Sequence, residues 1–112
     1  MNPYRDEVAL VLGAQRFVLR PTFEALAEME GVLGLGLLEM CGQLSRGKIT
    51  LRQLVALVAA GIKGGGGVVP DNLGQLILTQ GSVAVLGVVG PWLSAALSGE
   101  AGDDEDDAPG KA

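Results

Sequence analysis

Residues 7–20, with the sequence EVALVLGAQRFVLR, follow a pattern with a period of two on either side of a glycine. A period of two over such short segments predicts β-strands, and Gly13-Ala14 suits a two-residue type II′ turn, which needs glycine at its first central position. This turn sets the predicted pairs: Val8 with Leu19, Ala9 with Val18, Leu10 with Phe17, Val11 with Arg16, and Leu12 with Gln15. One face of the hairpin is then nearly all apolar, whereas the other ends in the opposite charges of Glu7 and Arg20.

Short helices are predicted to follow the hairpin, within residues 22–97. Apolar side chains recur at helical spacing in the segments 23–33, 36–45 and 51–62. Thr50 and Gln53 have the spacing of a capping box, in which each side chain satisfies the backbone amide of the other residue, so the third helix is expected to begin there. It is expected to end at the four glycines of residues 64–67, which we interpret as a flexible linker between helices.

The apolar segment after residue 70 is compatible with more than one structure. Pro70 is expected to open a short helix that ends at Gly81, and Ser82 to cap a last helix that is broken or kinked at Gly90-Pro91. The β-branched run Val83–Val89 is also compatible with a strand. We favour a helix pair, apolar on most sides because it packs inside the domain or against a second copy. Together with the hairpin, this predicts an α+β fold with one compact domain over residues 1–98.

Residues 72–99 carry no charged side chain, which makes a membrane span an alternative. A span needs about 20 predominantly apolar residues. The segment, however, contains Gln75, Thr79, Gln80 and Pro91, and no Lys or Arg flanks it to give the positive-inside bias. We therefore expect a buried helix pair and no membrane partner, and we keep a small single-span membrane protein as the second alternative.

Catalytic and metal-binding side chains are scarce in this chain. Its 112 residues include no His and one Cys, so the usual zinc and blue-copper ligand sets, and the Ser-His-Asp and Cys-His catalytic sets, cannot form within one chain. The lone Cys41 excludes an intrachain disulfide and lies on an apolar helical face, where a free cysteine packs as a small hydrophobe. We expect no enzyme activity, no catalytic residue, no cofactor and no metal.

The charges divide the chain into a neutral body and an acidic tail. The net charge of −5 comes from 8 basic and 13 acidic residues, and six of the acids but only Lys111 among the bases lie in residues 99–112. A run of like charge with no large apolar residue cannot bury a core, so this tail is expected to be disordered. We interpret it as a solubilising tail, with a regulatory arm that covers a partner surface as the alternative.

The basic residues of the body predict no extended positive face. They equal the acids of the body in number, and only Arg46, Lys48 and Arg52 cluster. Because a surface that tracks phosphates needs net positive charge along one face, nucleic acid is not an expected partner. The N-terminal sequence MNPYRDE also lacks the basic and apolar regions of a signal peptide, so we expect a cytoplasmic protein.

The order of these segments resembles a known family. Residues 20–30 read RPTFEALAEME after the second predicted strand, residues 34–38 read GLGLL, and residues 51–57 read LRQLVAL ahead of a Gly-rich break and an apolar C-terminal helix. Most of all over residues 8–60, the chain is similar to the small gene transfer agent family proteins that are encoded among phage-type tail genes and grouped with phage tail assembly chaperones.

The resemblance implies an assembly factor rather than an enzyme. Tail assembly chaperones coat the aggregation-prone tape measure protein and recruit tube subunits around it, so the implied partners are the tape measure protein and the major tail protein, together with self-association. The same family is also labelled a tail-tube component, which makes a structural subunit incorporated into phage-like particles the first alternative. No catalytic residues carry over from the family.

A protein that binds amphipathic helices needs accessible apolar surface, and a helix lying in a groove is the natural mode of recognition. In residues 82–97, we predict that this interface consists of Val83, Leu86, Val89, Trp92 and Leu93. The pattern fits Trp92 equally well as a core residue and as an interface anchor.

Overall fold

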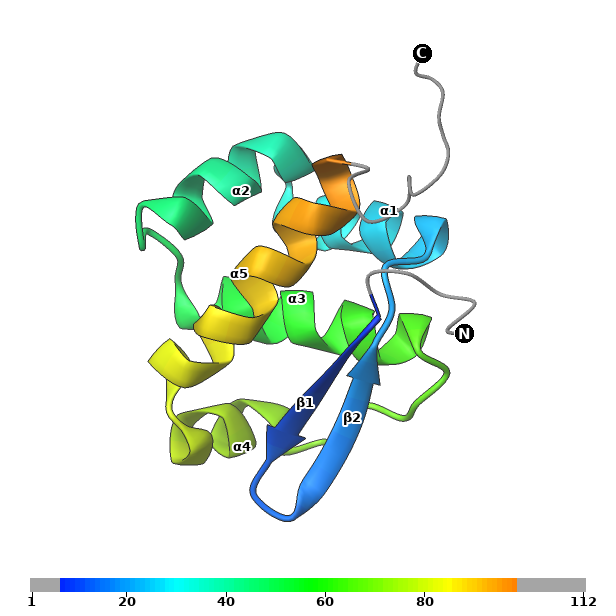
Figure 1. The fold of residues 1–112 in the computed structure, drawn as a ribbon, viewed down its shortest axis with the longest axis vertical. Coiled ribbons are helices and arrows are strands. Elements are labelled where there is room, and N and C mark those ends of the chain that lie inside the picture. Colours follow the sequence, from blue (N-terminus) through cyan, green and yellow to red (C-terminus); the bar gives the residue numbers. More distant parts are fainter. Residues whose placement is uncertain (1–6, 99–112) are drawn as a thin grey trace.

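A two-stranded sheet and five helices make up residues 7–98, the part of the chain that the computed structural model describes. The strands are β1 (Val8–Leu12) and β2 (Gln15–Leu19), and the helices are α1 (Phe23–Leu33), α2 (Leu37–Ser45), α3 (Leu51–Gly64), α4 (Leu73–Gln80) and α5 (Ser82–Ser98). The predicted α+β architecture is therefore confirmed (Figure 1). The disorder predicted for residues 99–112 lies outside the described residues.

The hairpin forms in the predicted register. β1 and β2 pair antiparallel, and all of the predicted pairs lie opposite one another. In the turn, Gly13 has a φ of 64°, the positive value that the predicted turn requires at this position. Beyond the strands, a guanidinium nitrogen of Arg20 lies 2.7 Å from a carboxylate oxygen of Glu7, so the predicted pair of opposite charges is also present.

One face of the hairpin closes the hydrophobic core. Leu10, Leu12 and Leu19 are buried on this face, which packs against helices α3, α4 and α5. Burying a leucine side chain stabilises a fold by about 1.5–3 kcal/mol, so these three residues hold the sheet onto the helices. On the opposite face Val11 remains half exposed.

Helix α3 is the central helix of the molecule and begins with the predicted capping box. The Thr50 hydroxyl accepts a hydrogen bond from the Gln53 amide at 3.1 Å, and the Gln53 side-chain oxygen accepts one from the Thr50 amide at 2.9 Å. Its inner side buries Leu54, Leu57 and Val58. From this position α3 contacts β2 and helices α1, α4 and α5, so four of the other six elements pack directly against it.

The glycine run 64–67 packs closely against the hairpin. Gly64 is the last residue of α3 and Gly65 its C-cap. A Cβ on Gly64 would overlap the carbonyl oxygen of Arg20, and one on Gly65 would overlap the carbonyl oxygen of Val18. The Arg20 amide also donates a hydrogen bond of 3.1 Å to the Gly61 carbonyl. The first two glycines therefore allow α3 to approach β2 closely, where we had expected a flexible linker.

Helix α5 continues through Gly90-Pro91, so the alternative of a break there and the alternative strand over Val83–Val89 are wrong, whereas the kink stays a prediction. Proline has no backbone N–H, so the helix lacks the one hydrogen bond that residue 91 would donate to the Gly87 carbonyl. The packing of α5 against the core outweighs this loss. Within residues 7–98, no single helix has the length and apolar character to cross a membrane. Helices α4 and α5 meet that criterion only as a pair, which is bent by 104° between them.

Candidate apolar groove between helices α2 and α5

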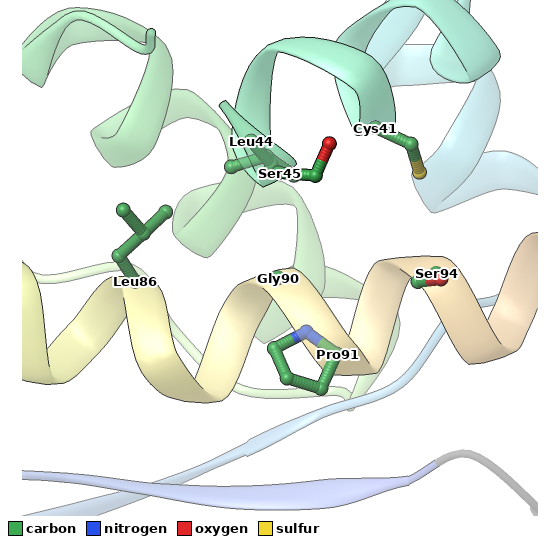
Figure 2. Close-up of a pocket in the computed structure, with 7 residues that line it drawn as sticks. All are labelled: Cys41, Leu44, Ser45, Leu86, Gly90, Pro91 and Ser94. Carbon is green, nitrogen blue, oxygen red and sulfur yellow. The ribbon is translucent and has the colours of Figure 1, made fainter. Parts of the chain in front are cut away.

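A groove of about 300 Å³ lies between α2 and α5. Its walls are formed by Cys41, Leu44 and Ser45 from α2 and by Leu86, Gly90, Pro91 and Ser94 from α5. Figure 2 shows the two helices running in opposite directions, with Cys41 at the end of the groove near Ser94 and Leu44 at the end near Leu86. None of the lining residues is charged, so the groove offers an apolar surface with two hydroxyls and a thiol.

Small residues on α5 keep this groove open. Gly90 has no side chain, and a Cβ placed on it would meet no atom within 4 Å. One turn further on, Ser94 is exposed and contributes only a short hydroxymethyl group. Because α2 is held against the core by Leu37, Met40 and Leu44, it cannot move in to fill the space. The hollow is therefore a consequence of residue size on one helix and anchoring of the other.

A second hollow continues the groove toward the N-terminus of α5. It measures about 210 Å³ and is lined by Gly47, Ile49, Thr50, Leu51, Leu54, Ser82, Val83 and Leu86. Leu86 lines both hollows, so together they follow α5 from Ser94 back to Ser82. At this end Val83 is 82% exposed to solvent. We refer to the two hollows together as the α2–α5 groove.

The thiol in the groove is not activated for chemistry. Cys41 is half-buried, and burial raises the pKa of its thiol above the ordinary value. Reactive cysteines have a lowered pKa, because only the thiolate is a nucleophile. Cys41 is therefore protonated at neutral pH and contributes apolar lining to the groove.

The five residues predicted as an interface do not share one surface. Val89 and Leu93 are fully buried and Trp92 is nearly so, all within the chain's own core. Val83 and Leu86 line the α2–α5 groove and are accessible. Residues 82–98 therefore pack within the chain, with Trp92 as a core residue, and only two of the five predicted residues can meet a partner on this folded surface.

The α2 wall of the groove and the small residues facing it were not predicted from the sequence. Cys41 had been predicted only to pack on an apolar helical face, and nothing local shows that α2 lies beside α5. A usable signal was the spacing of Gly87, Gly90 and Ser94, which recur at three and four residues along an otherwise bulky apolar helix. Such a recurrence indicates that one face of the helix carries only small side chains. It does not show which element lies against that face.

Comparison with known proteins identifies the family. The family described as phage tail tube protein, GTA-gp10, matches residues 5–99, which include every described strand and helix. The searches of curated proteins and of solved structures gave no match. The match covers most of the chain and confirms the resemblance to gene transfer agent proteins. The chain belongs to the phage tail tube protein, GTA-gp10, family, and is a tail-associated protein of the gene transfer agent type.

Proposed function

We propose that this chain is a cytoplasmic chaperone of tail assembly, which holds a helical segment of the tape measure protein in the α2–α5 groove until tail-tube subunits join. The observation that carries this proposal is the groove itself, an open apolar channel between two helices with no charged residue in its main hollow. Family membership supplies the tail context. The proposal includes no catalytic step.

The groove suits a helix with an apolar stripe. Such helices insert side chains spaced by three, four and seven residues into apolar grooves. Leu44 and Leu86 offer matching apolar contacts in the main hollow, and the exposed Val83 extends the surface at its end. Binding would remove the Val83 side chain from water, which stabilises a complex by roughly 25 cal/mol for each Å² of apolar area buried.

A groove of this size favours reversible binding. Interfaces that bury little area are typical of transient contacts, whereas permanent subunits bury much larger surfaces. A chaperone must release its client when tube subunits arrive, so moderate affinity spread over many copies along one client chain suits the task. The tape measure protein is long, and each copy needs to cover only a short helical stretch.

Co-purification with the tape measure protein tests this proposal. We expect Leu86→Asp to abolish co-purification, because it places a charge in the apolar groove, whereas Leu78→Asp should bind normally. Leu78 is a matched control, since it is a half-exposed leucine on α4 that lines neither hollow. Circular dichroism shows whether both variants remain folded. Normal binding by a folded Leu86→Asp chain would contradict the proposed site.

A structural tail-tube subunit is the second candidate, because β1 has a free edge. The hairpin register directs the backbone groups of Ala9 and Val11 away from β2, and in residues 7–98 no other element bonds to them. A free edge can accept a strand from another subunit. Quantitative mass spectrometry of purified particles separates the two candidates: retention at a fixed stoichiometry supports the tube subunit, and absence from finished particles supports the chaperone.

A further inference from the structure

The charged side chains of the helices are divided by sign along the chain. Residues 23–45 carry four acids and no base, whereas residues 46–63 carry four bases and no acid. Two ion pairs form within the described residues: one lies in the hairpin, and the other joins Glu28 to Lys63. The charges left without an ion pair among the described residues are therefore acidic on α1 and α2 and basic around the start of α3.

The outer face of α1 combines an exposed aromatic ring with two acids. Phe23 is 80% exposed, and the exposed residues Ala27 and Glu30 follow it at helical spacing on the same face. Glu24 is exposed beside Phe23 and forms no ion pair within residues 7–98. Aromatic side chains are enriched at protein–protein interfaces. We call these four residues the acidic face.

The start of α3 carries the opposite charge. Lys48 and Arg52 are exposed, and Leu51, between them in the sequence, is 41% exposed and lines the second hollow. Arg46 does not belong to this group, because its guanidinium lies beside Gly42 on α2. The first turn of α3 contains no acid, although the positive end of the helix dipole favours acids there. An acid supplied by another molecule would therefore be stabilised at Lys48, Leu51 and Arg52, which we call the basic end.

The acidic face and the basic end lie too far apart to pair within one chain. A Cβ on Gly64, the last residue of α3, would come within 3.0 Å of the Cβ of Ala25, the neighbour of Glu24. Arg52 is in the first turn of α3, so at a rise of about 1.5 Å per residue it lies about 18 Å from Gly64 along the helix. Figure 1 shows α1 and the connection between α2 and α3 on opposite sides of the molecule. Charges that are exposed to physiological salt are screened over about 8 Å, so the two surfaces do not neutralise one another.

We propose that copies of this chain associate head to tail, with the acidic face of one copy against the basic end of the next. The two acids then lie against the two bases of the next copy, and Phe23 packs on its Leu51. Exposed ion pairs contribute little by themselves, so the aromatic ring supplies the anchor and the charges determine the orientation. Because the two surfaces differ, every pair of copies leaves one of each unoccupied, and association continues into rows or rings.

This contact leaves the main hollow of the α2–α5 groove accessible. The residues that line this hollow belong neither to the acidic face nor to the basic end. A row of copies therefore presents one main hollow for each chain, which would cover a long client in successive short stretches. This last consequence rests on the proposed function, whereas the contact between copies does not.

Mixing two variants, each with one surface disabled, tests the contact. Phe23→Ser with Glu24→Lys disables the acidic face, and Lys48→Glu with Arg52→Glu disables the basic end. In sedimentation equilibrium at low salt, we expect the mass of the wild-type chain to rise with concentration beyond that of two chains. Each variant alone should keep the mass of one chain, 11.4 kDa. An equimolar mixture should form a 1:1 dimer and nothing larger, because it contains only one intact contact.

The control and the salt dependence separate this contact from a change in net charge. Arg16→Glu is the matched control, because Arg16 is an exposed base of the hairpin outside both surfaces, and this variant should associate as the wild type does. At about 0.5 M salt, where charges are screened over a few ångströms, association of the wild type should weaken severalfold. A wild-type chain that stays monomeric up to about 1 mM, or that stops at a dimer, overturns the proposal, and so does a mixture that stays monomeric. Because no client is present, such a result would leave the co-purification test undisturbed.

Discussion

We expect Gly64→Ala to destabilise the fold, although alanine normally favours a helix. Gly64 is the last residue of α3, where it lies against the end of β2. A Cβ at this position would overlap the carbonyl oxygen of Arg20 and come within 3.0 Å of the Ala25 Cβ. The carbonyl oxygen belongs to the backbone and cannot rotate away as a flexible side chain can. Either α3 or β2 must therefore move.

The size of this effect follows from three contributions. Overfilling a packed site costs about 1–3 kcal/mol. Moving β2 also weakens the hydrogen bond from the Arg20 amide to the Gly61 carbonyl, which contributes about 0.5–1.5 kcal/mol. The higher helix propensity of alanine offsets these costs by about 1 kcal/mol. We therefore expect the free energy of unfolding to fall by about 0.5–3.5 kcal/mol, with a decrease in Tm of about 4–8 °C for each kcal/mol.

Urea unfolding followed by the fluorescence of Trp92 measures this change. Gly31→Ala is the matched control, because Gly31 lies inside α1 and a Cβ on it would meet no atom within 4 Å. That variant should be stabilised by about 0.5–1 kcal/mol, so the two substitutions should differ in sign. If Gly64→Ala stabilised the protein as Gly31→Ala does, the close approach of α3 to β2 would be refuted, and residues 64–67 would be the flexible linker after all.

Three further predictions concern the cap, the core and the thiol. Thr50→Ala should lower the free energy of unfolding by about 1 kcal/mol through loss of the capping box, and an unchanged urea midpoint would contradict that role. Leu57→Ala, at a fully buried position, should cost about 2–5 kcal/mol, whereas the half-exposed Leu78→Ala should change stability by less than about 0.5 kcal/mol in the same assay. Because burial raises the pKa of Cys41, alkylation should reach its half-maximal rate at a higher pH in the folded than in the urea-unfolded chain. The folded state then binds the thiol proton more tightly, so the free energy of unfolding should decrease as pH rises through this titration.

Local rules were sufficient for the elements whose signals lie within a few residues. The turn at Gly13 determines the hairpin register. Once the turn residues are known, the residue opposite each strand position is fixed, and a shift by one residue would move every side chain to the other face. The capping box joins Thr50 and Gln53, only three residues apart, so it is readable without any knowledge of the rest of the fold. These features were predicted correctly because the interactions that create them are themselves local.

The groove and the role of the glycine run depend on contacts between distant segments. Gly64 is required by the carbonyl of Arg20, 44 positions earlier, and a sequence pattern shows the flexibility of glycine but not the backbone that approaches it. Pro91 likewise predicted a break or a kink, and α5, which packs against the core, continues through it without a break. The sequence did not show which of the five predicted interface residues are buried for a related reason, since no charged residue marks which side of α5 faces outward.

The apolar character of α5 on nearly all sides has a physical explanation in two distinct surfaces. Val85, Val89 and Leu93 recur at intervals of four residues and are buried in the core, so this side of the helix holds the sheet and α3 together. Leu86 and Gly90 lie on an adjacent side and line the groove. A charged residue on the first side would unfold the domain, whereas one on the second would leave it folded and repel the apolar helix that we propose as the client. Substitutions on the two sides should therefore separate stability from binding, which is the behaviour expected of a small domain that presents a groove.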